Sequence, residues 1–408
     1  MSKSNKHAVQ ERYDFPNSQK LWHEGAARTG SLGCEQCHYR QQCGGLQVEA
    51  QVFDCLSFCR CQNPAKCDNV CPRNVEHFVA RIQEVGGFAL DAVPAAPRLA
   101  HLCLPTMVPM VYHSSARARA PATSVVALSL YEFFDKRTGV LRFDSREAVL
   151  DRFKISDGAT IILSGTDEDP PLERWWRLHD RQGSARALRT LGVKLITTPN
   201  YSLFGDVPRL DNLYNMKRIA ITTSEIQSAD VLCALHVNAR TDRDWDRWIE
   251  HLIRHDEYMY VSFEFGTGAG ARPRMPWHVE QLCRLAREVG RPLTLLVRGG
   301  MAVLPVLGDA FANVTLIDTV SFMKAQHRQR AVIGNAVLGW ERALTPQGEP
   351  IDELFDHNIG AVNAHALALL GKSDVSGPLV ERGRGTDTTH DAGNESLDAH
   401  GLAEACRD

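Results

Sequence analysis

The chain alternates between short apolar runs and polar, helix-like segments over residues 101–370. Each run is rich in Val, Ile and Leu and ends in polar residues or glycine, a pattern typical of buried β-strands. Between the later runs, apolar residues recur at helical spacing among charged ones. The pattern therefore predicts strands that alternate with amphipathic helices. The predicted strands lie within residues 106–113, 124–132, 159–168, 192–200, 230–238, 258–266, 292–300 and 313–321.

This alternation favours a parallel sheet covered by helices, because a helix usually carries the chain back between two parallel strands. Eight such strands suit a (β/α)8 barrel, so we predict a barrel-like α/β body over residues 101–370. An open doubly wound sheet is the alternative fold. The link from Tyr112 to Val125 is short for a helical crossover, which leaves a hairpin as a second arrangement for the first two strands.

Ionisable residues stand at the ends of the predicted strands, where a (β/α)8 barrel carries its chemistry. Glu264 lies between two phenylalanines in VSFEFG, and burial there raises a carboxyl pKa toward the range useful for acid or base catalysis. Asp318 ends the run VTLID in the same way. We predict Glu264 and Asp318 as acid, base or nucleophile, and Arg298 of VRGG as an anion clamp. The structural alternatives are a salt bridge inside the barrel for Glu264 and Arg298, and a helix cap for Asp318. The same pattern places Tyr131, Glu132, Thr166, Asp167 and Glu168 at the rim.

A long loop follows the fourth predicted strand, in the sequence TTPNYSLFGDVPRLDNLYNMKRIAI of residues 197–221. It interleaves basic and aromatic side chains, a composition that grips phosphates and stacks bases. The alternative for Lys217 and Arg218 is the solvated face of a helix. The predicted substrate-binding residues, which include two polar residues at the end of the fifth strand, are Asn200, Tyr201, Arg209, Lys217, Arg218, His236 and Asn238.

Composition divides the chain into four parts: a polar lead (1–30), a cysteine-rich metal-binding domain (31–100), the barrel-like domain (101–370) and a disordered tail (371–408). The formal net charge of -3 gives no global attraction to nucleic acid or to membranes, so either partner would need a local patch. The N-terminus lacks the apolar stretch of a secretory signal, and no long apolar span follows it. We therefore expect a cytoplasmic protein with no membrane partner.

Eight of the 12 cysteines crowd into residues 34–71 with the spacing C-x2-C-x5-C-x11-C-x3-C-x-C-x5-C-x3-C. In a reducing compartment such a cluster is expected to hold metal rather than disulfides. Thiolate ligands at irregular spacing, ending in Cys-Pro, favour one or two four-iron iron–sulfur clusters, and zinc is the alternative. Three cysteines in apolar surroundings, Cys103, Cys233 and Cys283, are predicted to pack in the core. The predicted metal ligands are Cys34, Cys37, Cys43, Cys55, Cys59, Cys61, Cys67 and Cys71.

The sequence LITTPNYSLFGDVPR and the strand–helix repeats after it resemble domain-of-unknown-function family 4417, a family of bacteria and mobile elements. That resemblance covers residues 190–330 and implies no particular reaction. The late strands TLLVRGG and VTLIDTVSF are also similar to those of tRNA-guanine transglycosylase barrels and their DNA-acting relatives. This second resemblance implies a carboxylate nucleophile, Asp318 or Glu264, and a nucleobase exchanged at its glycosidic bond. The chain departs from that family because its cysteines precede the barrel and lack the C-x-C-x2-C…H zinc pattern.

Together these observations predict an iron–sulfur-type metalloprotein whose barrel rim acts enzymatically on a nucleotide or a nucleic acid. The alternative function is a non-catalytic component of a phage or mobile-element system that binds nucleic acid or a protein partner. In that case the metal cluster would only stabilise the fold.

Overall fold

The computed structural model describes residues 81–203, 209–270, 274–335, 337–346 and 348–371. It also describes two short antiparallel strands, β1 (Thr29–Gly30) and β2 (Gln47–Val48). The eight predicted metal-ligand cysteines and the predicted tail from residue 372 onward lie outside the described residues.

Eight parallel strands form the central sheet in the order β3-β10-β9-β8-β7-β6-β5-β4. The first and last of these, β3 and β4, meet in a parallel bridge between Met110 and Ala127, and Val111 N donates to Ala127 O at 2.9 Å. The sheet is therefore a nearly closed barrel, and the (β/α)8-like prediction is confirmed, whereas the hairpin between the first two strands is wrong. The strands are β3 (Met107–Pro109), β4 (Val125–Ser129), β5 (Thr160–Ser164), β6 (Val193–Thr197), β7 (Leu232–His236), β8 (Tyr260–Glu264), β9 (Thr294–Arg298) and β10 (Asn313–Asp318).

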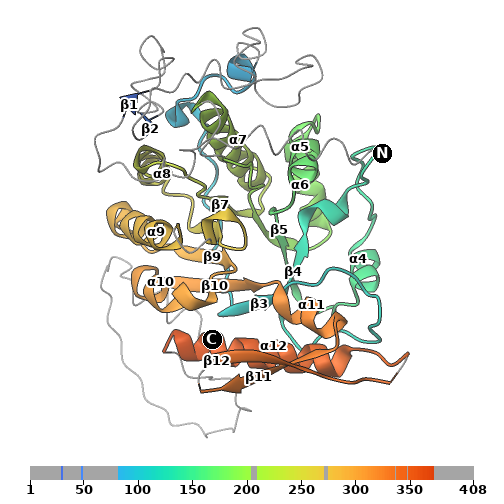
Figure 1. Ribbon diagram of the computed structural model, residues 1–408. Coiled ribbons are helices and arrows are strands. Elements are labelled where there is room, and N and C mark those ends of the chain that lie inside the picture. The colour runs from blue at the N-terminus through green and yellow to red at the C-terminus, as the bar shows by residue number, and fades with distance from the viewer. Residues whose placement is uncertain are drawn as a thin grey trace, which may run out of the picture.

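Helices surround the strands, as Figure 1 shows. Local sequence explains where they begin: in α8, Thr241 and Asp244 form a capping box, and Trp245, Trp248 and Leu252 turn one apolar face to the core. The α-helices are α4 (Arg146–Phe153), α5 (Asp169–Trp176), α6 (Arg181–Thr190), α7 (Arg209–Gln227), α8 (Asp242–Arg254), α9 (Met275–Val289), α10 (Leu304–Ala310), α11 (Val320–Gln326) and α12 (Asp352–Leu369). Short 3-10 turns are η4 (Leu90–Ala92), η5 (Leu130–Phe133), η6 (Gly268–Gly270) and η7 (Met301–Val303).

The link between β3 and β4 contains no helix, and the last helix, α12, covers that side of the barrel instead. Its Asp352 carboxylate accepts from Ala118 N at 2.6 Å and lies 3.8 Å from Arg117 Nε, and Ile351 N donates to Ala116 O at 2.8 Å. A hairpin of β11 (Gln329–Gly334) and β12 (Val337–Arg342) packs beside α12 at the foot of Figure 1. The C-terminal part of the described chain thus completes the first barrel unit, which explains how so short a link joins two parallel strands.

The amino-terminal end of the barrel is closed by the segment that enters it. Leu99, Leu102 and Leu104 pack on the interior cluster that contains Val108, Ala127, Ile162 and Leu195. Tyr260 at the start of β8 fixes this segment, because its hydroxyl accepts from Leu102 N at 2.6 Å and donates to Leu102 O at 2.8 Å. The barrel therefore has an apolar floor at the amino-terminal ends of its strands.

Residues 81–100, which the sequence boundaries assign to the cysteine-rich domain, pack against the barrel helices through the buried side chains of Val85, Phe88, Leu90 and Val93. Cys233 is buried in the core as predicted, and Cys283 is half-buried. Cys103 is exposed, so its predicted core position is wrong. Within the described ranges, no helix is long and apolar enough to cross a membrane.

Candidate functional site

A cavity of about 830 Å³ opens at the carboxyl ends of the barrel strands. Its lining comes from the segments that follow β3, β4, β5, β6 and β8, from Arg298 at the end of β9 and from Arg152 in α4. Glu132, Thr166, Asp167, Glu168 and Arg298 were expected at this rim from the sequence, and all five line the cavity. These five strand-end residues therefore lie around one cavity.

Glu264 and Arg298 form an ion pair of which Arg298 lines this cavity. They are directly paired residues on β8 and β9, and Arg298 Nη1 lies 3.4 Å from Glu264 Oε2. Glu264 points into the barrel, because it has the same strand parity as Tyr260, which belongs to the interior cluster. Its side chain is 3% exposed, whereas that of Arg298 is 24% exposed and lines the cavity. The arginine therefore lies between the carboxylate and solvent.

Burial raises the pKa of Glu264, although the charge of Arg298 and the N–H of Gly266 act in the opposite direction. Gly266 N donates to Glu264 Oε1 at 2.5 Å, while Oε2 is a buried atom without a hydrogen-bond partner. A carboxyl group in this position can hold a proton above its usual pH range and still exchange it with a ligand near Arg298.

Tyr112 joins this pair from the end of β3. Its hydroxyl oxygen accepts a hydrogen bond from Arg298, and burial, the larger influence, raises the pKa of the phenol, so the hydroxyl keeps its proton at physiological pH. His113, the next residue, also lines the cavity; burial and the charge of Arg152 lower its pKa. The predicted strand TMVPMVYH ends in these two residues, so the search for polar residues at strand ends could have found both.

The cavity walls carry charges of both signs. Asp167, Glu168 and Asp169 stand at the amino-terminal end of α5, and the Asp169 carboxylate accepts from Ser202 Oγ at 2.6 Å. Arg152, in the last turn of α4, supplies a positive charge. No sequence motif marked Arg152, Ser202 or Asp169, since their place depends on how the helices and loops pack.

Asp318 ends β10 but does not belong to the cavity lining. Its carboxylate accepts from Val320 N at 2.8 Å and from Ser321 N at 3.2 and 3.3 Å, which caps the first turn of α11. Burial raises its pKa, and these hydrogen bonds lower it in part. The geometry is that of the helix-cap alternative.

His236 and Asn238, at the end of β7, lie deeper. His236 Nδ1 is 3.4 Å from Ser262 Oγ, and burial lowers its pKa to about 3, so the imidazole is neutral. Asn238 Nδ2 donates to Asn200 Oδ1 at 2.9 Å, and Trp248 Nε1 donates to the Asn238 carbonyl at 2.8 Å. These contacts hold the β6 and β7 ends together, and none of the three predicted substrate residues lines the cavity.

The basic and aromatic side chains of the long loop, which were predicted to contact substrate, contact other residues of the protein. Lys217 donates to Ala89 O, and the residue is 2% exposed. The Arg218 guanidinium, equally buried, lies 3.8 Å from the Tyr201 ring centre and donates to Glu173 Oε1 at 2.9 Å. Neither residue lines the cavity, and the side chain of Arg209 lies outside the described residues.

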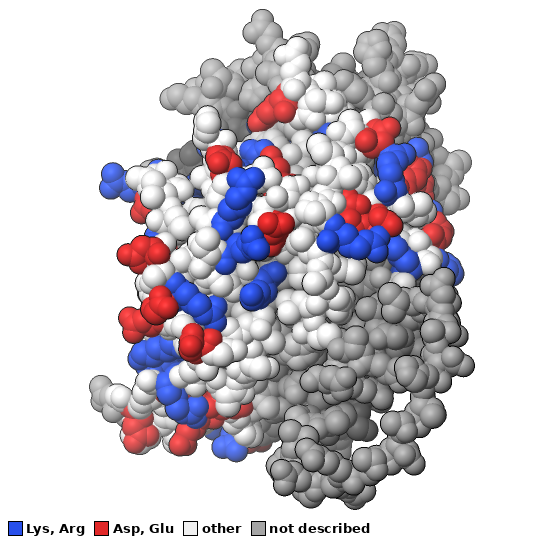
Figure 2. All heavy atoms as spheres, turned by 180° about the vertical axis from the view of Figure 1, so that it is seen from behind, with Lys and Arg blue, Asp and Glu red and all other residues white. Residues whose placement is uncertain are grey.

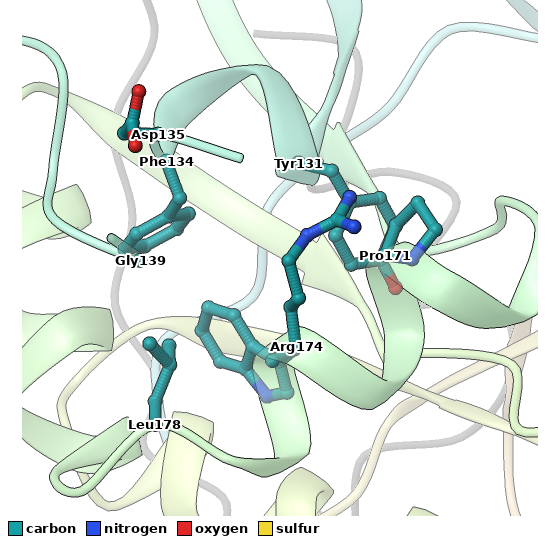
Figure 3. A pocket seen from close by; sticks show the side chains of 8 residues that line it. Tyr131, Phe134, Asp135, Gly139, Pro171, Arg174 and Leu178 are labelled. Carbon is teal, nitrogen blue, oxygen red and sulfur yellow. The ribbon is translucent and has the colours of Figure 1, made fainter. Parts of the chain in front are cut away.

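A second, much smaller pocket of about 20 Å³ lies beside η5 and α5. Figure 3 shows the Arg174 side chain reaching across it toward Tyr131, with Phe134 and Leu178 on the other side. Such a volume holds about one water molecule. This pocket is therefore a packing gap behind Tyr131 rather than a second ligand site.

The described face in Figure 2 intersperses Lys and Arg with Asp and Glu, without a continuous basic area. Over the ranges that the structure describes, no group of three or more His, Cys, Asp or Glu residues is arranged to hold a metal ion. The cavity at the carboxyl ends of the strands, called the barrel-mouth cavity below, brings charged side chains such as Arg298, Arg152 and Asp167 around a volume of ligand size. In comparisons with known protein families and with curated proteins, no match to the chain was found.

Proposed function

We propose that this protein is an enzyme whose active site is the barrel-mouth cavity and whose substrate is a nucleotide or a nucleotide unit of a nucleic acid. The observation that carries the proposal is the Glu264–Arg298 pair, because it combines a buried carboxyl group of raised pKa with an arginine that reaches the cavity. Structural ion pairs are usually satisfied on both sides, whereas Glu264 Oε2 has no hydrogen-bond partner.

Arg298 would bind the phosphate of the substrate, since a planar guanidinium matches phosphate oxygens with paired donors. Glu264 would then act as general acid or base, and Tyr112 would orient Arg298 through its hydroxyl. When a phosphate takes up part of the charge of Arg298, the pKa of Glu264 rises further, because the cation is shared. Substrate binding would thereby keep the proton on Glu264 until it is transferred.

The size and lining of the cavity support a nucleotide. A volume of about 830 Å³ is typical of pockets for small organic ligands. The rings of Tyr112 and His113 offer surfaces on which a base can stack, and Asp167 and Glu168 can accept hydrogen bonds from amino or hydroxyl groups. Arg152 supplies a second positive charge for an anionic ligand.

The iron–sulfur cofactor stays part of the proposal on the strength of its donor set, eight cysteines within residues 34–71. Thiolates are the ligands that such clusters require, and zinc is the alternative metal for the same residues. The cluster would stabilise the N-terminal region, and no step at Glu264 depends on it.

The test has a binding part and a turnover part. Calorimetry with nucleoside 5′-monophosphates, nucleosides and inorganic phosphate should show that at least one monophosphate binds more tightly than its nucleoside. Arg298→Ala should weaken that binding about 10-fold to 100-fold, the loss of one charged hydrogen-bonding group. Arg298→Lys should fall between, and Arg177→Ala, an exposed arginine that does not line the cavity, is the matched control.

Turnover is then followed by mass spectrometry of nucleotides and short oligonucleotides incubated with the full-length protein. Glu264→Gln should keep the binding and abolish the conversion. Binding that never leads to conversion in the wild type would favour a binding component over an enzyme. Absence of phosphate-dependent binding in the wild type would refute the proposed site.

A further inference from the structure

The segment that leaves the cysteine-rich region runs along α7 and is bonded to it at several points. Lys217 donates to Ala89 O, Ser224 Oγ donates to Pro94 O at 2.8 Å, and Gln227 Nε2 donates to Pro97 O at 3.0 Å. These three residues lie along one helix, so α7 holds this segment at three points between Lys217 and Gln227.

Glu84, near the start of the described part of that segment, makes two bonds from one carboxylate. Its Oε1 accepts from Trp176 Nε1 at 2.6 Å, and its Oε2 accepts from Tyr214 Oη at 2.8 Å. Trp176 ends α5 and Tyr214 lies in α7. Glu84 therefore links two barrel helices to the segment that follows the cysteine-rich region. It lies 13 residues after Cys71, the last of the eight clustered cysteines.

Both aromatic rings enclose Arg218. Its guanidinium carbon lies 4.9 Å from the Trp176 ring centre, 5.0 Å from that of Tyr214 and 3.8 Å from that of Tyr201. A guanidinium between three rings gains cation–π attraction and keeps one orientation. The position of Arg218 consequently depends on the rings that Glu84 holds.

From Arg218 a short series of bonds leads to the cavity. Arg218 Nη1 donates to Asn215 Oδ1 at 3.1 Å, and Asn215 Nδ2 donates to Ser202 O at 2.6 Å. Ser202 Oγ donates to Asp169 Oδ1 at 2.6 Å, and Ser202 and Asp169 both line the cavity. Hydrogen bonds and cation–π contacts therefore connect Glu84 continuously to the cavity wall.

We propose that Glu84 is a positioning residue through which the N-terminal region sets the geometry of the barrel-mouth cavity. The carboxylate holds Trp176 and Tyr214, these hold Arg218, and Arg218 with Asn215 places the Ser202–Asp169 wall. For its effect on ligand affinity, the inference rests on the proposed nucleotide site. The coupling of Glu84 to Asn215 is a property of the protein that can be measured without any ligand.

The ligand-free test is NMR of the full chain labelled with ¹⁵N in tryptophan and asparagine. Glu84→Leu removes both acceptors, and Glu84→Gln keeps one oxygen that can accept from only one of the two partners well. Signals of the Trp176 indole and of the Asn215 side-chain amide should shift in both variants, more in Glu84→Leu. Glu280→Gln, an exposed carboxylate on α9, is the control and should move neither signal.

The ligand test is calorimetry with nucleoside 5′-monophosphates. Glu84→Leu should weaken the binding about twofold to thirtyfold, the range for coupling through packed networks, with an unchanged circular dichroism spectrum. A shift of the Trp176 signal with an unmoved Asn215 signal and wild-type affinity would overturn the inference. If the wild type binds no monophosphate, the proposed function fails. The Asn215 signal then decides by itself whether Glu84 is coupled to Asn215.

Discussion

Arg298 Nη1 lies 3.4 Å from Glu264 Oε2, and of these two paired residues only the arginine lines the cavity. A ligand that binds Arg298 therefore changes the environment of Glu264 without having to reach it first. Glu264 lies behind the arginine and is less accessible to a ligand. Its pKa is raised chiefly because it is buried.

This burial predicts how stability depends on pH. The pKa of Glu264 is raised in the folded state above the unfolded value of about 4.3, so the stability that its protonated form contributes is complete below that pH. It is lost as pH rises through the folded-state pKa. Glu264→Gln carries no charge, and its free energy of unfolding should fall less between pH 4 and pH 7 than that of the wild type. Urea unfolding at several pH values measures this difference.

Glu280→Gln serves as the control, since Glu280 is exposed on α9 and its variant should follow the wild-type pH dependence. If Glu264→Gln also runs parallel to the wild type, the carboxyl group is not perturbed by burial. Its role as a proton carrier above the usual pH range of a carboxyl group would then lose its physical basis.

The capping contact of Asp318 predicts a structural rather than a catalytic effect. Asp318→Ala removes the acceptor for Val320 N and Ser321 N and should cost about 1 kcal/mol of unfolding free energy, as loss of a helix cap does. Asp318→Asn keeps an acceptor and should cost less. Denaturant unfolding measures the stability, and phosphate-dependent ligand binding by either folded variant should stay close to wild type. A folded Asp318→Asn that keeps the binding but loses turnover would contradict this assignment.

Glu264 and Asp318 show what the sequence could and could not predict. Both end an apolar run, and the strand ends were predicted well because the alternation of strands and helices is strong. The strands of a parallel barrel are apolar on both faces, so the sequence does not reveal which residues point inward. Glu264 points into the barrel, whereas Asp318 meets the helix that follows it. Lys217 and Arg218 were predicted to contact substrate, with the solvated face of a helix as the alternative. Their observed partners come from segments distant in sequence, which no local pattern reveals.

The docking of α12 predicts a large effect at Asp352. Its carboxylate lies 3.8 Å from Arg117 Nε and accepts from Ala118 N, and the Arg117 side chain is fully buried. Asp352→Ala leaves that arginine without its ion-pair partner and should destabilise the protein by about 3 kcal/mol. Denaturant unfolding measures the loss.

Asp356→Ala is the matched control, because Asp356 pairs with Arg119, whose side chain is 51% exposed. Solvent screens a pair of that exposure, so Asp356→Ala should destabilise the protein less than Asp352→Ala does. Equal effects of the two variants would mean that α12 is held by its apolar face rather than by Asp352.

The floor of the barrel depends on one hydroxyl group. Tyr260 Oη accepts from Leu102 N at 2.6 Å and donates to Leu102 O at 2.8 Å. Tyr260→Phe leaves both backbone groups of Leu102 without this partner and should cost about 1–3 kcal/mol of unfolding free energy. Hydrogen exchange should show the Leu102 amide less protected in the variant. A loss of stability without faster exchange at Leu102 would place the effect elsewhere in the core.

The cysteine-rich segment predicts a metal content that can be measured directly. Protein purified without oxygen should be brown and contain iron and sulfide in near-stoichiometric amounts, because eight closely spaced thiolates suit iron–sulfur clusters. Cys34→Ser should lower both contents, since a serine oxygen is a poor ligand for such a cluster. Absorption and EPR spectra, with iron, sulfide and zinc analysis, give the answer.

Cys283→Ser is the matched control for this measurement. Cys283 is half-buried on α9 and is not one of the predicted ligands, so its variant should keep the full metal content. Colourless protein that contains zinc and no sulfide would replace the iron–sulfur cluster by a zinc site. In that case the N-terminal region would act on the cavity only as a scaffold, through contacts such as those of Glu84 with Trp176 and Tyr214.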